Sequence, residues 1–149
     1  GLGDVYKRQQ MYMNNDQARN AMLDYDAYYN AVNGQVNDLF YYYREQAALK
    51  ARQYQRALDD IVKAIELSPK DLTYRAEHAV VNLRVGRYEE SMKILNEILK
   101  DEPKYAEAYR LLGLCQIQLK KTDEACGNFN KAKELGDPNV DELIKKYCK

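Results

Sequence analysis

The chain contains 149 residues, and its 23 Lys and Arg residues are balanced by 23 Asp and Glu residues. This balance argues against nucleic acid or an acidic membrane surface as the main partner, because both attract a basic protein surface. The mean hydropathy is −0.73, and no apolar run approaches the roughly 18 residues expected of a membrane span. The length suits one domain with a continuous hydrophobic core.

The first residues of the chain share no pattern with the remainder. Residues 1–9 read Gly-Leu-Gly-Asp-Val-Tyr-Lys-Arg-Gln, and the stretch 4–9 resembles a translated transposon-end sequencing adapter. We expect residues 1–10 to be an artefact of this kind or an ordinary disordered tail, outside the fold in either case. In the first case the natural N-terminus is missing, so the sequence does not determine the compartment.

Apolar residues recur at helical spacing through the rest of the chain, and no alternating strand pattern is present. The residue before a proline avoids helical conformation, so helices should end near Pro69 and Pro103. Gly136 can supply a left-handed C-terminal cap, and Asp137-Pro138 an N-cap followed by a proline in the first helical turn. The predicted helices span 16–32, 38–51, 54–67, 72–85, 88–100, 106–119, 122–135 and 138–148.

Similar residue types recur every 34 positions, which is the strongest signal in the sequence. Pro69 and Pro103 are 34 residues apart, as are Tyr54 and Tyr88. Four columns of three residues follow the same interval, namely Leu49, Leu83 and Ile117; Ala57, Ser91 and Ala125; Ile61, Leu95 and Phe129; and Ala64, Ile98 and Ala132. Each period holds two predicted helices, so the chain is predicted to be a series of antiparallel helix pairs.

Two antiparallel helices in 34 residues resemble the tetratricopeptide repeat of bacterial-type proteins, over about residues 38–139. The third unit matches best, with Tyr109, Leu112, Gly113, Ala125, Phe129 and Ala132 at signature positions. Glu45 and Ile98 depart from the small residues usual at their positions. The resemblance implies an all-α fold, an α-solenoid of stacked antiparallel helix hairpins with a C-terminal capping helix.

The resemblance also divides the chain into segments. These are the tail 1–10, the second helix of a truncated repeat with its linker at 11–37, three repeats at 38–71, 72–105 and 106–139, and the capping helix 138–148. The truncated repeat should leave an exposed apolar strip around Met22, Tyr25 and Tyr29. At the other end, Val140, Leu143, Ile144 and Tyr147 form the inward face that a closing helix requires.

The cysteines leave two interpretations open. Cys126 and Cys148 lie equally far from the turn near Asp137, so antiparallel helices would place them level with each other. A disulfide that clamps the capping helix and two buried thiols fit this spacing equally well. A bridge would favour a bacterial periplasmic or secreted setting, whereas free thiols would favour the cytoplasm.

We expect no enzyme activity, metal or cofactor. Cys115, Cys126, Cys148 and His78 lack any recognised metal-ligand spacing. No motif places a nucleophile beside His78, the single histidine, to form a catalytic triad. No glycine-rich run precedes a Lys-Ser or Lys-Thr pair, so a phosphate-binding loop is not predicted either.

In proteins that this chain resembles, the first helices of the pairs line a concave groove for an extended peptide or a partner helix. The resemblance assigns to this groove Leu39, Tyr42, Gln46, Leu49 and Lys50 of the first repeat, Thr73, Ala76, Val80, Leu83 and Arg84 of the second, and Glu107, Arg110, Leu114, Ile117 and Gln118 of the third. An aliphatic floor with Lys50, Arg84 and Arg110 at its rim favours ligands with apolar anchors and an acidic flank.

Some such repeat proteins bind the acidic C-terminal tails of heat-shock chaperones through a clamp of Lys, Arg and Asn side chains. The corresponding positions here are Tyr42, Gln46, Glu77, Glu107 and Leu111, so we expect this clamp to be absent. The sequence therefore predicts a non-catalytic protein-interaction module, a scaffold or adaptor. Two alternatives stay open: self-assembly through the tyrosine-rich end, and an accessory segment of a larger enzyme or regulator.

Overall fold

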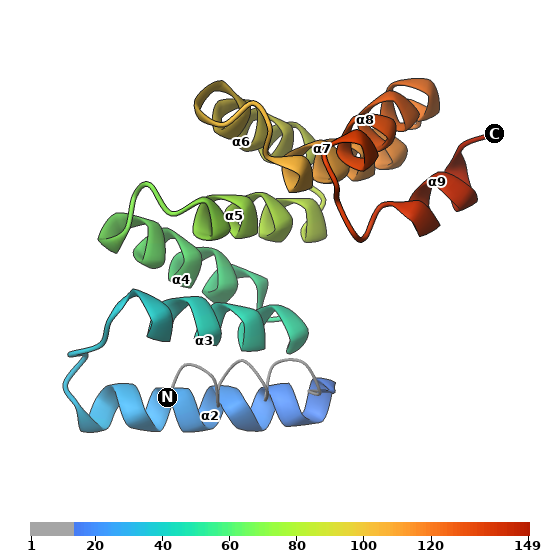
Figure 1. Ribbon diagram of the computed structural model, residues 1–149. Coiled ribbons are helices and arrows are strands. Elements are labelled where there is room, and N and C mark those ends of the chain that lie inside the picture. The colour runs from blue at the N-terminus through green and yellow to red at the C-terminus, as the bar shows by residue number, and fades with distance from the viewer. Residues whose placement is uncertain (1–13) are drawn as a thin grey trace. The chain divides into compact units, whose positions relative to one another are not determined.

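The computed structural model describes residues 14–149, and the expected tail at 1–10 lies outside the described residues. Two compact units divide the chain between Tyr74 and Arg75. All regular structure in the described part is helical (Figure 1). The helices are α2 (Asn15–Ala31), α3 (Asp38–Lys50), α4 (Tyr54–Leu67), α5 (Leu72–Arg84), α6 (Tyr88–Asp101), α7 (Ala106–Gln118), α8 (Thr122–Glu134) and α9 (Asp141–Tyr147).

The predicted all-α repeat fold is confirmed, and seven of the eight helices begin and end within one residue of their predicted bounds. Short polar residues start the first two helices. Asn14 and Gln17 form a reciprocal capping box at α2, and the Asn37 side chain accepts a hydrogen bond from the Phe40 amide at α3. Such caps satisfy backbone donors that have no partner within the helix.

The turn inside each helix pair has the same left-handed geometry. Arg52, Gly86 and Lys120 lie 34 residues apart, and their φ angles are 62°, 84° and 61°. The residue that follows each of them donates its amide to a carbonyl five residues earlier, always at 2.8 Å. Only the middle turn has a glycine, which adopts this conformation without a steric penalty. The 34-residue period therefore extends to backbone conformation, not only to side-chain type.

In unit 1, α2 packs against α3, and α3 packs against α4. The predicted exposed strip on α2 is wrong: Met22 is 1% exposed and Tyr25 4% exposed, because this stripe is the face that packs on α3. The Tyr25 ring meets the Phe40 ring edge-on at 5.6 Å. The exposed apolar residues of α2 are instead Leu23, 67% exposed, and Tyr28, 45% exposed.

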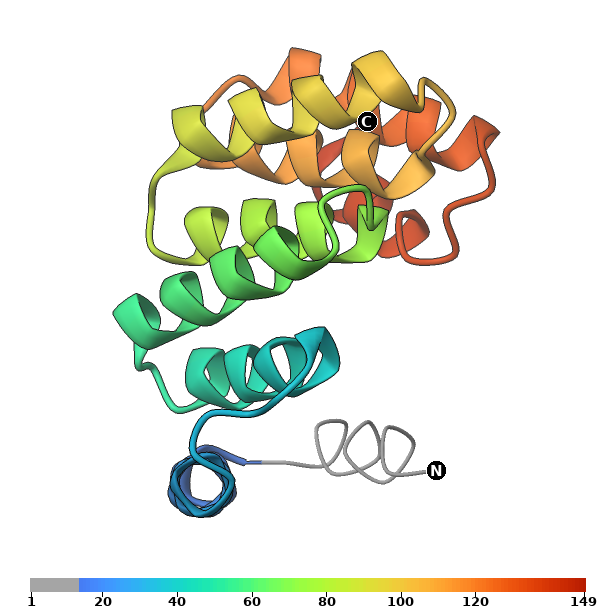
Figure 2. The same cartoon turned by 90° about the vertical axis from the view of Figure 1, so that its left-hand side faces the viewer.

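In unit 2, α6 runs alongside α7 (Figure 2), α7 packs against α8, and α8 packs against α9. The Phe129 side chain of α8 is fully buried at the closest approach between α7 and α8. A Cβ atom built on Gly113 of α7 would lie only 2.3 Å from Cε1 of that ring. The small residue at this repeat position therefore allows the two helices to pack closely.

The capping helix is shorter than predicted. It begins at Asp141 with Val140 as its N-cap residue, not at residue 138. Oδ1 of Asp137 accepts the amide of Asn139 at 2.7 Å, so Asp137 stabilises a turn of its own instead of capping the helix. Cys148 follows the helix in extended conformation.

Candidate protein-binding faces

The first candidate face lies on α3 of unit 1. Leu39, Tyr42, Gln46 and Lys50 follow helical spacing and share one side of the helix. Leu39 is 41% exposed, and the other three side chains are half-buried. Leu49, expected in the groove floor, is instead buried in the core. We call the four accessible residues the α3 face.

The α3 face combines an apolar anchor with aromatic and cationic groups. The Tyr42 ring lies 5.3 Å from the Tyr43 ring and 5.2 Å from the Tyr74 ring, measured between centroids. Burial lowers the pKa of Lys50, because a partly desolvated ammonium group is less stable than one in water. A ligand that pairs with this ammonium group would compensate for the loss of hydration.

A partly buried hydrogen-bond network fixes Tyr74 beside the α3 face. The Tyr74 hydroxyl donates to Oδ2 of Asp38 at 2.7 Å, and the Ser68 hydroxyl donates to the same oxygen at 3.2 Å. The Tyr74 bond is the main reason that the pKa of Asp38 is lowered. Sequence reasoning selected the neighbouring Thr73 instead. The available signal was the 34-residue relation between Tyr74 and the buried Phe40.

A second group that sequence reasoning missed lies behind the α3 face. Nε and Nη2 of Arg44 donate to the two carboxylate oxygens of Asp60 at 2.9 and 2.8 Å, and Nη1 lies 3.3 Å from Oδ1 of Asp26. The guanidinium carbon is 5.0 Å from the centroid of the Tyr29 ring. Burial opposes the charge, but the bonds and charge of Asp60, followed by the charge of Asp26, raise the pKa of Arg44.

Arg44 thus joins α2, α3 and α4 and is not offered to a ligand. Buried arginine–carboxylate pairs of this geometry have two parallel hydrogen bonds and a defined orientation. The sequence signal is a departure from the repeat. Arg44 occupies a column in which the third repeat has Leu112, and Asp60 occupies one in which the second repeat has Ile94.

The second candidate set of residues lies in unit 2, on α5 and α7. Val80 and Leu83 are half-buried and Arg84 is exposed on α5, whereas Ala76 is buried and offers no surface to a ligand. Thr73 is exposed on the part of α5 that belongs to unit 1. The residues on α7 are Glu107, Arg110, Leu114, Ile117 and Gln118, of which Gln118 is exposed and the others are half-buried.

Arg110, expected as a rim cation, is already paired. Its Nε donates to Oδ2 of Asp137 at 2.9 Å, and its Nη2 lies 3.7 Å from Glu107. Only 3% of the Asp137 side chain is exposed, so this ion pair is largely shielded from water. Arg84 therefore supplies the accessible positive charge among the predicted residues of unit 2.

The remaining sequence candidates have structural surroundings. Cys126 and Cys148 form a disulfide with an S–S distance of 2.04 Å, and the thiol of Cys115 is buried, which raises its pKa. Burial also lowers the pKa of His78. Within residues 14–149, no group of three or more His, Cys, Asp or Glu side chains is arranged to hold a metal ion. No helix in that range is long and apolar enough to cross a membrane.

Comparison with known proteins assigns this architecture to a class of helical repeat proteins. The family model "Tetratricopeptide repeat" matches residues 48–113 and 82–125, which together cover just over half of the chain. The chain belongs to the tetratricopeptide repeat (TPR) family.

Curated relatives resemble only part of their own length. Heat shock protein STI1 of Saccharomyces cerevisiae is 32% identical over 65% of this chain and 17% of that protein. Small glutamine-rich tetratricopeptide repeat-containing protein 2 of Mycosarcoma maydis is 29% identical over 66% of this chain and 28% of that protein. The chain thus spans less than a third of these relatives.

Solved structures share the fold at low sequence identity. YrrB, a TPR protein with an unusual peptide-binding site, is 21% identical with a TM-score of 0.75, covering 97% of this chain and 71% of that one. The first TPR domain of Spaghetti (RPAP3), bound to the HSP90 peptide SRMEEVD, is 19% identical with a TM-score of 0.64, covering 74% and 90%.

Proposed function

We propose that the chain is a non-catalytic protein-interaction module, a scaffold or adaptor in which the first helices bind a peptide or a partner helix. The observation that carries this proposal is the α3 face. Leu39 remains 41% exposed beside an aromatic pair, Tyr42 and Tyr74, whose second ring is held in place by Asp38. A rigid apolar anchor surrounded by polar groups is typical of binding hot spots. Peptide binding by TPR relatives supports the same proposal.

The charges on these faces favour a ligand with apolar anchors and few acidic groups. Lys50 of unit 1 and Arg84 of unit 2 are the cations left to a ligand among the predicted residues, since Arg110 pairs with Asp137. The clamp positions hold Glu77 and Glu107, among others, which would repel a carboxylate. We therefore propose that acidic chaperone tails such as the RPAP3-bound peptide are not the ligand here.

The test separates the two units. A displayed peptide library is selected against the immobilised chain, and the enriched peptides are measured by fluorescence anisotropy. We expect Leu39→Asp, or the pair Leu83→Asp and Arg84→Glu, to weaken the peptides that use that unit by about tenfold or more. Leu23→Asp is the matched control, because Leu23 is also exposed but lies on α2. Peptides that bind every variant equally, with unchanged helicity and melting, would refute the faces.

The peptide SRMEEVD tests the ligand class directly. We expect no saturable binding of this peptide to the chain, because a terminal carboxylate needs cationic partners that Glu77 and Glu107 do not provide. Introducing Glu107→Lys should then increase its affinity measurably. Tight binding by the unmodified chain would show that a different set of side chains receives the acidic tail.

Two alternatives have their own observations. Leu23 and Tyr28 expose apolar surface on α2, which would favour self-association; light scattering across a dilution series, with Leu23→Asp as comparison, tests it. An accessory segment of an enzyme is the other alternative. Serine/threonine-protein phosphatase T of Aspergillus oryzae is 29% identical over 66% of this chain but only 20% of that protein. The complete reading frame would decide this alternative.

A further inference from the structure

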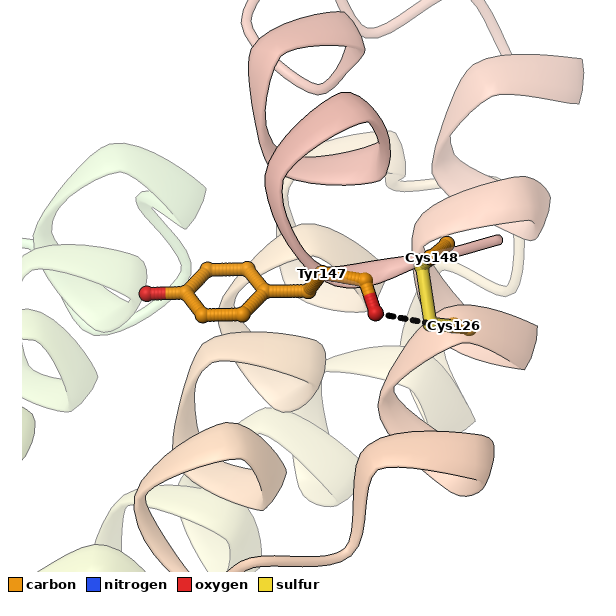
Figure 3. Close-up of a disulfide and its surroundings, with 3 residues drawn as sticks. All are labelled: Cys126, Tyr147 and Cys148. Carbon is orange, nitrogen blue, oxygen red and sulfur yellow. Dashed lines mark hydrogen bonds between the residues drawn. A yellow bond between two sulfur atoms is a disulfide. The ribbon is translucent and has the colours of Figure 1, made fainter.

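The Cys126–Cys148 disulfide joins α9 to the body of unit 2. It connects a residue in the first half of α8 to the residue that follows α9, with 5.8 Å between the Cα atoms (Figure 3). Both cysteines keep part of their surface exposed, so the bridge lies at the surface of the unit and not in its core. Its position makes it a covalent tether for the last helix.

Little else in the described structure holds α9. The helix has seven residues, and none of them is fully buried. Its partly buried Leu143, Ile144 and Tyr147 pack on the cluster that contains Phe129, and the Tyr147 ring stacks on the Phe129 ring at 6.5 Å. The Lys133–Asp141 ion pair is exposed and such pairs contribute little. A helix this short does not persist alone in water, so its order depends on this contact and on the tether.

The surface in contact with α9 is continuous and apolar. Ala125, Phe129 and Ala132 of α8 form a buried cluster, and Leu114 and Ile117 of α7 pack against it. We call these five residues the α9 dock. The occupant seated there is an amphipathic helix whose apolar side chains are spaced as Leu143, Ile144 and Tyr147. The dock therefore fits a helix with that spacing, and a loss of α9 would expose it.

We propose that the Cys126–Cys148 disulfide is a redox latch that keeps α9 on its dock, and that its reduction by a dithiol frees the dock for an amphipathic helix of a protein partner. One thiolate of the dithiol attacks a sulfur of the bridge and forms a mixed disulfide, releasing the other cysteine as a thiolate. The second thiolate of the reductant then displaces the remaining cysteine. Both cysteines gain a proton, and the reductant becomes the disulfide. This latch goes beyond the proposed function, which concerns α3, α5 and α7.

After reduction only a weak interaction can replace the bridge. Sγ of Cys126 lies 3.7 Å from the carbonyl oxygen of Tyr147 (Figure 3). A disulfide sulfur has no proton, so this contact becomes a hydrogen bond only in the reduced chain. A thiol is a poor donor. The covalent link is thus exchanged for a contact that a short helix can easily break.

Hydrogen exchange of the full chain, followed by mass spectrometry with and without a dithiol, tests the latch. On reduction we expect the amides of α9 to exchange on the order of a hundredfold faster, the factor expected from closing a loop with a separation of 22 residues. Amides inside α7 and α8 should keep their protection. Cys148→Ser should show the fast exchange without reductant. Cys115→Ala, which keeps the bridge, is the matched control and should respond like the unmodified chain.

A second measurement tests the dock. A dye that fluoresces on apolar surfaces should bind the reduced chain and Cys148→Ser several-fold more strongly than the oxidised chain. A peptide of residues 138–149 carrying Cys148→Ser, added in excess, should displace the dye. Unchanged α9 exchange on reduction, equal loss of protection in α7 and α8, or dye that the peptide cannot displace would each overturn the proposal.

Discussion

Substitution of Gly113 by alanine examines the close contact between α7 and α8. The new Cβ atom would lie 2.3 Å from Cε1 and 2.5 Å from Cδ1 of Phe129, and that ring is fully buried. Overpacking of this kind costs about 1–3 kcal/mol, and a contact this short belongs at or beyond the upper end. Alanine returns about 1 kcal/mol through its helix propensity. We therefore expect a net destabilisation of about 2 kcal/mol.

Chemical and thermal unfolding measure this effect. A loss of about 2 kcal/mol should lower Tm by about 4–8 °C for a chain of this size. Gly127→Ala is the matched control: Gly127 lies inside α8, and a Cβ atom there meets nothing within 4 Å. That substitution should stabilise the chain by up to about 1 kcal/mol.

A double mutant identifies the cause of the destabilisation. Phe129→Leu removes the ring edge that the new Cβ meets, so Gly113→Ala should cost far less in that background than in the unmodified chain. The coupling between the two substitutions should exceed about 1 kcal/mol. If Gly113→Ala stabilises the chain as Gly127→Ala does, or costs the same with and without the Phe129 ring, the reasoning from close packing is refuted.

Three further predictions concern a turn, a buried ion pair and pH. Lys120→Gly should stabilise the chain by about 1 kcal/mol in urea unfolding, because Lys120 has a φ of 61°, which costs an L-residue about 1–2 kcal/mol relative to glycine. Arg44→Met should cost about 3–5 kcal/mol by the same measurement, because it leaves the Asp60 carboxylate buried without its partner. The lowered pKa of Asp38 stabilises the fold above the pKa of the unfolded chain, and this contribution should be lost as pH falls through the lower folded value. Tyr74→Phe should make the acid dependence of unfolding in urea shallower.

Each of these has a contrary outcome. Gly86→Ala is the reverse control for the turn and should destabilise the chain, because Gly86 has a φ of 84°; a neutral result there and at Lys120 would exclude turn strain. Asp60→Leu combined with Arg44→Met should recover most of the stability that the single change removes. No recovery would mean that Arg44 acts through packing alone. An unchanged acid profile in Tyr74→Phe would remove Tyr74 as the cause of the Asp38 shift.

The helices were predictable because their determinants are local and repeated. Columns such as Ile61, Leu95 and Phe129 are fully buried in the structure, and a period of 34 residues shows them in the sequence. Even the left-handed turns recur at that period, although Arg52 and Lys120 give no composition signal for them. Periodicity therefore supplies information that single-residue propensity does not.

The errors share another physical origin, which is pairing between side chains that no repeat column contains. Arg110 was predicted to face a ligand, yet Asp137, 27 residues away, pairs with it. Asp137 was predicted to cap a helix, yet it supports a turn and this ion pair. The stripe through Met22 was correctly identified on α2, but its periodicity does not tell which neighbour covers it.

These pairings change the electrostatics of ligand selection in a specific way. A column-by-column transfer counts Lys50, Arg84 and Arg110 as cations, but the Arg110–Asp137 pair is neutral overall and shielded from water. Each unit then presents one accessible cation among the predicted residues, and Lys50 is partly desolvated. A partly desolvated cation gains more from one well-placed carboxylate than an exposed one does, because its charge is less screened. Affinity should therefore depend on the position of a single acidic group beside an apolar anchor, and adding further acidic residues to a ligand should bring little.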